Sequence, residues 1–160
     1  MNEKHLFAIG LMSGTSLDGI DLVYVKFLEN DLSFFEIVHA DTIAYATAWK
    51  QELQKAIHFS AEELRVLDQT YGKHLGQVLQ DFIGNYQIKN LDFIASHGHT
   101  ILHEPQKGST LQVGAGAEIA KITQQKVVCD FRTQDVQLGG QGAPLVPIGD
   151  ACYFRAMNFV

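Results

Sequence analysis

The stretch GLMSGTSLDGID, residues 10–21, combines glycines, hydroxyl side chains and two aspartates between apolar runs. A glycine-rich turn can present successive backbone N–H groups to an anion, and the hydroxyls of Ser13, Thr15 and Ser16 can donate to phosphate oxygens. Asp18 and Asp21 supply carboxylates for Mg²⁺, directly or through water. The chemistry favoured is therefore phosphate binding, by Gly14, Thr15, Ser16, Leu17, Asp18, Gly19, Ile20 and Asp21.

The spacing of Gly14 and Gly19 is that of a P-loop, but a P-loop continues with Lys-Ser/Thr and a helix. Here Ile20 and Asp21 follow, and the chain enters an apolar run typical of a strand. Asp18-Gly19 is also a strong signal for a plain β-hairpin turn, which is the alternative interpretation. Seven consecutive residues with turn chemistry, where two would close a hairpin, favour a phosphate loop at a hairpin tip.

Three histidines, His97, His99 and His103, lie within SHGHTILHEP, residues 96–105. Alternate residues of a strand face the same way, so His97 and His99 could form a metal pair. No cysteine or aspartate completes a familiar metal spacing, which favours a polar ligand-binding loop at the C-terminal end of a strand. Histidines that only cap loops are the third interpretation, and it stays open.

Asp130 and Arg132 follow a predicted strand in CDFRTQD, residues 129–135. Arg132 could hold a carboxylate or phosphate in bidentate fashion, or form a surface ion pair that contributes little. The spacing alone does not choose between these roles. The nearby GGQGAPLVP, residues 139–147, predicts a structured loop, because its glycines allow close backbone approach and its prolines, Pro144 and Pro147, restrict the chain.

Hydrophobic periodicity places these segments on an α/β scaffold. Strands are predicted at 6–12, 20–28, 32–46, 91–98, 110–116 and 126–131, and the first three form consecutive antiparallel partners. Helices are predicted at 46–58, from the capping box at Ser60–Glu63 to Gly84-Asn85, and at 117–125. The alternation predicts an α/β fold with a mixed sheet and helices on the sheet faces.

The composition narrows the function classes. The 160 residues suffice for one domain with a core, and 46% hydrophobic with 19% charged residues is ordinary for a globular protein. A formal charge of -6 without a basic cluster excludes a non-specific nucleic-acid binder. No apolar run is long enough to span a membrane and no signal peptide is visible, so we expect a cytoplasmic protein without membrane contact. The apolar end, DACYFRAMNFV, predicts the first part of a longer protein.

In chain order, GLMSGTSLDGIDLV, ASHGHTILHEP, LQVG and VVCDFRTQDVQLGGQGAPLVP resemble the N-terminal portion of anhydro-N-acetylmuramic acid kinases, from about Ile9 to Pro147. The resemblance implies a ribonuclease-H-like domain of the actin-like ATPase and sugar kinase superfamily. There, two domains close on ATP and the first β-hairpin holds its phosphates, in agreement with the role that the residues themselves favour. Residues 1–160 would be the N-terminal domain of a two-domain sugar kinase whose C-terminal domain is absent from this chain.

The reaction that the resemblance implies is phosphoryl transfer from ATP, with Mg²⁺, to the 6-oxygen of 1,6-anhydro-N-acetylmuramic acid. Water opens the anhydro ring in the same event, giving N-acetylmuramic acid 6-phosphate for peptidoglycan recycling. Together with the positions of the polar loops, the resemblance assigns sugar contacts to His97, Thr100, Glu104, Asp130, Arg132 and Gln141. Arg132 is expected to hold the lactyl carboxylate, and Thr100 or His97 the ring oxygens.

The chain also departs from the family pattern, because a second phosphate motif of the type LNIGG and an FDxGPGN motif are missing. The resemblance places the general-base aspartate and most of the adenosine pocket in that missing part. We therefore expect no catalytic base among residues 1–160 and no turnover by this chain alone. The complete protein could form a homodimer.

Three other functions stay open. A nucleotide-switch ATPase of the same superfamily would use the hairpin without a sugar acceptor. A metal-dependent hydrolase would use His97, His99 and His103 as ligands. A non-catalytic module would bind sugar and ignore nucleotide.

Overall fold

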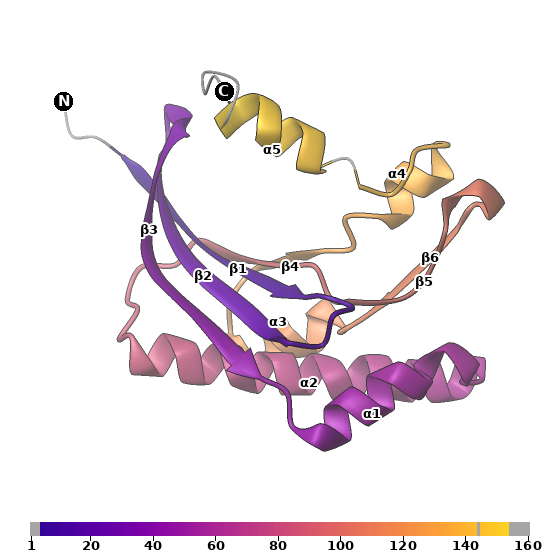
Figure 1. The fold of residues 1–160 in the computed structure, drawn as a ribbon. Helices are drawn as coiled ribbons and strands as arrows, with labels where there is room; N and C mark the ends of the chain where they lie inside the picture. Colours follow the sequence, from indigo (N-terminus) through magenta and orange to yellow (C-terminus); the bar gives the residue numbers. More distant parts are fainter. Residues whose placement is uncertain (1–3, 144, 154–160) are drawn as a thin grey trace.

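Five strands form one mixed sheet in the computed structural model, which describes residues 4–143 and 145–153 (Figure 1). The strand order is β3-β2-β1-β4-β7. The strands are β1 (His5–Ser13), β2 (Gly19–Leu28), β3 (Asp31–Ala44), β4 (Phe93–Ser96) and β7 (Val127–Cys129). The first three pair antiparallel, whereas β4 pairs parallel to β1 and to β7. The antiparallel start and the mixed sheet predicted from the sequence are confirmed.

Helices lie on both sides of this sheet (Figure 1). Figure 1 shows α1 (Thr47–Lys55), α2 (Ala61–Asn85) and α3 (Gly116–Thr123) on one side, with α5 (Leu145–Tyr153) on the other. The predicted capping box begins α2: the Ser60 hydroxyl accepts the Glu63 N–H, and the Glu63 carboxylate accepts the Ser60 N–H. This reciprocal pair satisfies two of the free donors at the helix start. The capping box therefore fixes where α2 begins.

The core lies between the sheet and α2. Alternate residues of β1, Ile9 and Leu11, point toward the helices and are almost fully buried. On α2 the buried side chains recur at helical spacing and include Leu67, Tyr71, Leu75, Leu79 and Phe82. Burying a large apolar side chain contributes about 1.5–3 kcal/mol, so this layer holds the ends of β1 and β4 in register. Those strand ends carry the predicted site.

Two regions differ from the expectation. SHGHTILHEP was expected to be a loop, but His99–Glu104 forms β5, which pairs antiparallel with β6 (Ser109–Val113) in a separate two-stranded sheet. The short 3-10 turn Pro105–Lys107 and Gly108, at φ +69°, close this hairpin. The strand expected at 110–116 is present as β6, and it pairs with β5 in this hairpin rather than joining the five-stranded sheet.

The second difference lies near the end of the chain. A short helix, α4 (Thr133–Gln137), follows β7, and α5 begins inside the loop expected at 137–147. Pro144, which belongs to the expected loop, lies outside the described residues. Residues 154–160, which belong to the apolar chain end, also lie outside them. Across the part that is described, no helix combines the length and apolar character that crossing a membrane requires.

Candidate functional site

The predicted phosphate loop is the tip of the β1–β2 hairpin. The Leu17 N–H donates to the Gly14 carbonyl at 3.2 Å, which closes a turn around Thr15 and Ser16. Leu17 has φ +56°, an uncommon value for a branched residue, and its side chain is only 7% exposed. The buried leucine therefore anchors the tip to the core while the residues beside it face solvent.

Polar groups at this tip are free to meet a ligand. Thr15, Ser16 and Asp18 are exposed, and none of their backbone N–H groups donates to an acceptor within residues 4–143 or 145–153. Successive unpaired N–H groups in a turn form a concavity that suits an anion. The loop thus has the donor set that the sequence predicted for phosphate, with two hydroxyls beside it.

The start of β2 is held close to β3. A Cβ on Gly19 would lie 2.6 Å from Thr42 Cγ2 and 3.0 Å from the Ile43 carbonyl oxygen, so no larger residue fits without movement. Ile20, the next residue, is 1% exposed and belongs to the core. Gly19 and Ile20 therefore support the loop rather than face solvent, whereas Gly14 has room for a Cβ.

Asp21 lies on the open face of the sheet. Its carboxylate is exposed and accepts the Thr42 hydroxyl at 2.7 Å. Asp21, Met12 and His97 line one cavity of about 600 Å³ on that face. Asp18 is thus an exposed carboxylate on the tip itself, and Asp21 is an exposed carboxylate three residues further on, in β2. Carboxylates of this kind suit Mg²⁺ held partly by phosphate oxygens.

His97 and Arg132 form the second half of the site. Arg132 Nε–H donates to His97 Nε2 at 3.0 Å, so Nε2 is an acceptor and the ring proton lies on Nδ1, which donates to the Gly98 carbonyl at 3.1 Å. Burial, with a smaller effect from the Arg132 charge, lowers the pKa of His97. The imidazole is therefore neutral near pH 7, with both nitrogens occupied.

Arg132 also reaches the glycine-rich loop. Its Nη1 donates to the Gly142 carbonyl at 2.8 Å, and the Gly142 N–H donates to the Asp135 carboxylate at 2.6 Å. Gly142 has φ +73°, and a Cβ there would lie 2.8 Å from the His103 ring. Arg132 is therefore a clamp that joins the end of β4 to the loop carrying the exposed Gln141.

The remaining predicted sugar contacts are spread along the β5–β6 hairpin and the start of α4. Thr100 lies next to Gln112, whose amide donates to its hydroxyl at 3.5 Å. Glu104 forms an ion pair with Lys107 at 2.6 Å where the hairpin turns. Asp130 has φ +59° and accepts the Thr133 hydroxyl at 2.5 Å. The structure brings His97 and Asp130 to one cavity, and it places Glu104 at the far end of β5.

That cavity, of about 290 Å³, contains residues that the sequence did not single out. Asp68, Ser96, Thr110, Gln112 and Thr133 line it with His97 and Asp130. The Asp68 carboxylate accepts the Gly114 N–H at 2.8 Å, and burial raises its pKa. Asp68 lies within the helical pattern of α2, where nothing in the sequence distinguishes it from a surface residue. Ser96 and Thr133 lie within the polar segments 96–105 and 129–135, and Gln112 lies within LQVG, so these three residues had a local signal.

The three histidines do not gather into a metal site. His97 is bonded to Arg132, His99 is 4% exposed beside Tyr71, and His103 is exposed and bonded to Thr110. No group of three His, Cys, Asp or Glu side chains within residues 4–143 and 145–153 could hold a metal ion. The geometry of this part of the chain therefore gives the hydrolase alternative no ligand set.

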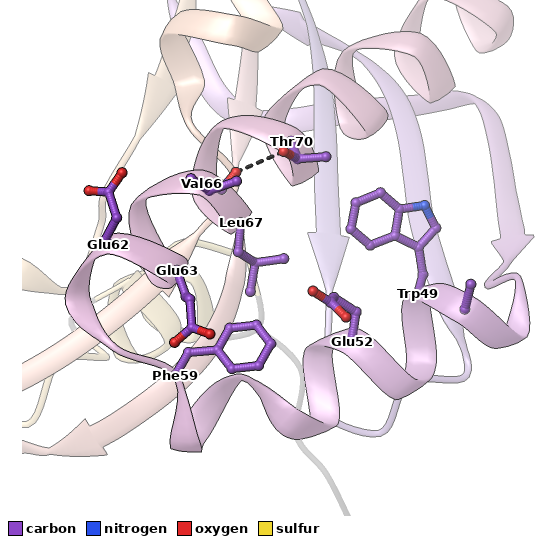
Figure 2. Close-up of a pocket in the computed structure, with 9 residues that line it drawn as sticks. Trp49, Glu52, Phe59, Glu62, Glu63, Val66, Leu67 and Thr70 are labelled. Carbon is purple, nitrogen blue, oxygen red and sulfur yellow. Dashed lines mark hydrogen bonds between the residues drawn. The ribbon is translucent and has the colours of Figure 1, made fainter.

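A separate groove lies between α1 and the start of α2. Figure 2 shows Trp49, Phe59 and Leu67 around an apolar hollow of about 560 Å³, with glutamates at its rim. None of the predicted site residues lines this groove. Its lining includes Glu52, Glu62 and Glu63, and these carboxylates do not suit a phosphate.

The comparisons with known proteins identify the family of the chain. The sequence profile described as anhydro-N-acetylmuramic acid kinase matches residues 6–160. Anhydro-N-acetylmuramic acid kinases of Bacillus thuringiensis subsp. konkukian (strain 97-27) and Bacillus cereus (strain G9842) are each 35% identical over 163 aligned residues. Each alignment covers 94% of this chain and 42% of the relative, so the chain spans about two fifths of the length of these relatives. The chain belongs to the anhydro-N-acetylmuramic acid kinase family.

Proposed function

We propose that the complete protein transfers a phosphoryl group from ATP to the 6-oxygen of 1,6-anhydro-N-acetylmuramic acid while water opens the anhydro ring. The product would be N-acetylmuramic acid 6-phosphate, for use in peptidoglycan recycling. One structural observation carries the proposal in a chain of this family: the β1–β2 tip presents unpaired N–H groups of Thr15, Ser16 and Asp18, and the exposed carboxylate of Asp21 follows in β2. Such a tip can cradle the phosphates of ATP.

On the nucleotide side, residues 14–21 would hold the phosphates, with the hydroxyls of Thr15 and Ser16 as further donors. Asp18 and Asp21 would hold Mg²⁺ through the phosphates, and the ion would neutralise charge that develops during phosphoryl transfer. The exposure of both carboxylates supports this assignment.

On the sugar side, His97 and Arg132 would form the central contact. The Arg132 guanidinium uses Nε and one Nη1 hydrogen on protein acceptors, which leaves its other N–H groups for the lactyl carboxylate. Thr100, Asp130 and Gln141 would contact hydroxyl or amide groups of the sugar. Glu104 is the most distant of the proposed contacts and would have to leave Lys107 or reach the sugar at its edge.

The general base and the adenosine pocket would lie in the part of the relatives that this chain does not span. Only about two fifths of their length is present, and the proposed reaction needs a base for the water that opens the anhydro ring as well as a held triphosphate. We therefore propose that the 160-residue chain alone does not turn over.

The test is ADP release by the polypeptide from the complete reading frame, with and without the anhydro sugar. Strong sugar-dependent release is expected, with N-acetylmuramic acid 6-phosphate as the product by mass spectrometry. ADP release that ignores the sugar would instead favour a nucleotide-switch ATPase. No release by a folded complete protein would overturn the kinase proposal.

A further inference from the structure

A buried cluster of polar side chains lies directly behind the phosphate loop. It consists of Ser13, Tyr45, Tyr71 and His99, whose exposures are 1%, 6%, 0% and 4%. The Tyr45 and Tyr71 hydroxyls form a hydrogen bond of 2.5 Å. These four residues come from the end of β1, the segment after β3, the middle of α2 and the start of β5. One cluster thus joins three elements and the segment that follows β3.

The cluster keeps polar atoms that the core does not satisfy. Ser13 Oγ and His99 Nδ1 are buried without a hydrogen-bond partner among the described residues. The Ser13 hydroxyl lies beside both tyrosine hydroxyls. Apolar residues of similar shape would avoid the desolvation of these atoms, so packing alone does not account for a polar cluster here.

Both tyrosines and His99 are uncharged near neutral pH. Burial raises the pKa of Tyr45 and Tyr71, and burial lowers the pKa of His99. Their contacts are therefore those of neutral, directional groups rather than of an ion pair. The Tyr71 ring also meets the His99 ring edge-on, with ring centroids 6.3 Å apart. Directional contacts of this kind fix the orientation of these side chains more than they add to the stability of the fold.

The cluster stands between the two halves of the proposed site. Ser13 immediately precedes Gly14 of the phosphate loop. His99 follows His97 by two residues, through Gly98, where φ is +69° and a Cβ would lie 2.7 Å from the Val113 carbonyl oxygen. The chain between His97 and His99 is therefore tightly constrained, and a shift of His99 carries His97 with it.

We propose that Tyr71, held by Tyr45, is a positioning residue that fixes the phosphate loop relative to the His97–Arg132 half of the site. Tyr71 acts on the loop through Ser13 and on the sugar side through His99. The proposal rests on the proposed kinase function for its catalytic consequence, but not for its structural one. Phosphoryl transfer depends on alignment of donor and acceptor, so a small displacement between the halves lowers kcat more than it weakens binding.

The catalytic test compares Tyr71→Phe and Tyr45→Phe in the complete protein, since each removes one hydroxyl and keeps the ring. We expect kcat to fall about tenfold or more, with KM for ATP and sugar changed less than about threefold. The double variant should be no worse than either single one, because all three lose the same hydrogen bond. An unchanged kcat, or losses that multiply, would overturn the proposal.

Tyr24→Phe is the matched control. Tyr24 is 6% exposed, and its hydroxyl donates to the Asn90 carbonyl at 2.7 Å, away from both loops. The Tyr24→Phe variant loses a buried hydroxyl and one hydrogen bond, as Tyr71→Phe does. It therefore reproduces the general effect of such a loss on the stability of the fold. A fall in kcat in Tyr24→Phe equal to that in Tyr71→Phe would reduce the role of Tyr71 to folding.

A second measurement does not depend on the kinase proposal. The Leu17 N–H donates to Gly14 on one side of the cluster, and the His97 N–H donates to the Leu11 carbonyl at 3.1 Å on the other. Amide hydrogen exchange in the 160-residue chain should be faster at both sites in Tyr71→Phe, by about threefold to tenfold, and unchanged there in Tyr24→Phe. Faster exchange at only one site, or at neither, would overturn the coupling whatever the complete protein catalyses.

The only tryptophan of the chain reports on the same cluster. Trp49 packs edge-on against Tyr71, with ring centroids 5.2 Å apart, and lines the groove of Figure 2. Its emission should shift in Tyr71→Phe and stay as in the wild type in Tyr24→Phe if the core around Tyr71 rearranges. An emission spectrum identical in all three proteins, together with unchanged exchange, would show that Tyr71 positions nothing.

Discussion

At the scale of single residues, Arg132 is a cation whose described partners are both neutral. The sequence predicts a cation that holds a carboxylate or phosphate, and leaves a surface ion pair as the alternative. In the structure Arg132 is half-buried and donates to His97 Nε2 and the Gly142 carbonyl. Neither partner is an acid, so the guanidinium carries a positive charge with no described carboxylate bonded to it. A charge kept in this way suits an anionic ligand.

Replacing Arg132 tests whether its geometry or only its charge matters. Arg132→Lys keeps the charge but cannot reach His97 and Gly142 with a planar fork, so both Arg132→Lys and Arg132→Ala should raise the KM for the sugar. Loss of a charged hydrogen bond of about 1.5–3 kcal/mol corresponds to a rise of roughly tenfold to a hundredfold. Steady-state kinetics of the complete protein measures this, with Arg65→Lys, an exposed ion-paired arginine, as control. An unchanged KM would remove Arg132 from the sugar site.

Asp21 gives a second prediction at this scale. Asp21→Asn removes the charge but keeps the size and the acceptor for Thr42, so the hairpin should stay folded. The Mg²⁺ concentration that gives half-maximal ADP release should rise, because a neutral amide binds this ion weakly. Asp31→Asn makes the same charge change at the β2–β3 turn, where the carboxylate accepts the Ser33 N–H, and should leave it unchanged. Equal effects of the two variants would mean that Asp21 acts only through net charge.

At the scale of elements, segments with a local signal were predictable, including the short strands β4, β6 and β7, whereas β5 and α4 were not. The sequence predicts the antiparallel start and α2, since β-hairpin turns and the Ser60 capping box are local signals. The strand β5 was missed because SHGHTILHEP is rich in polar residues and pairs with β6 outside the main sheet. Asp68 was missed as a site residue because only tertiary packing brings α2 beside Gly114.

Replacing either of two glycines of α2 by alanine should change the free energy of unfolding in opposite directions. A Cβ at Gly72 would lie 2.7 Å from the Ala115 carbonyl oxygen, so Gly72→Ala must push the turn before α3 away. We expect a loss of about 1–3 kcal/mol in the free energy of unfolding. At Gly84 nothing lies within 4 Å, and Gly84→Ala should stabilise by up to about 1 kcal/mol through helix propensity. Urea unfolding of the chain decides both signs, and a stable Gly72→Ala would contradict the close approach.

At the scale of the whole molecule, the chain carries the proposed phosphate loop and the proposed sugar contacts, whereas the proposed general base lies in the part of the relatives that it does not span. Its open sheet face carries Asp21 and His97, and it spans 42% of the Bacillus thuringiensis relative. The 160-residue chain should therefore show no sugar-dependent ADP release under conditions in which the complete protein does. A coupled ADP assay at matched concentrations measures this, and circular dichroism checks that the shorter chain is folded. Turnover by the short chain would place the general base within residues 1–160.

The stability of the chain should fall in mild acid, because burial lowers the pKa of His74, His97 and His99. Unfolded histidines bind protons near pH 6.5, whereas these three bind them only at lower pH in the folded chain. Their contribution is present above about pH 6.5 and is lost as the pH falls toward the folded pKa values. Each group can add a slope of at most about 1.4 kcal/mol per pH unit.

Urea unfolding at pH 7.5 and 5.5 measures this loss, and His74 isolates one part of it. His74 stacks on Trp49, with ring centroids 4.8 Å apart, and takes no part in the proposed site. His74→Gln should shrink the difference in unfolding free energy between the two pH values, because one proton-binding group disappears from the unfolded chain. A pH difference that survives His74→Gln intact would mean that His74 takes up its proton equally in both states, and that the loss in acid comes from the histidines of the site.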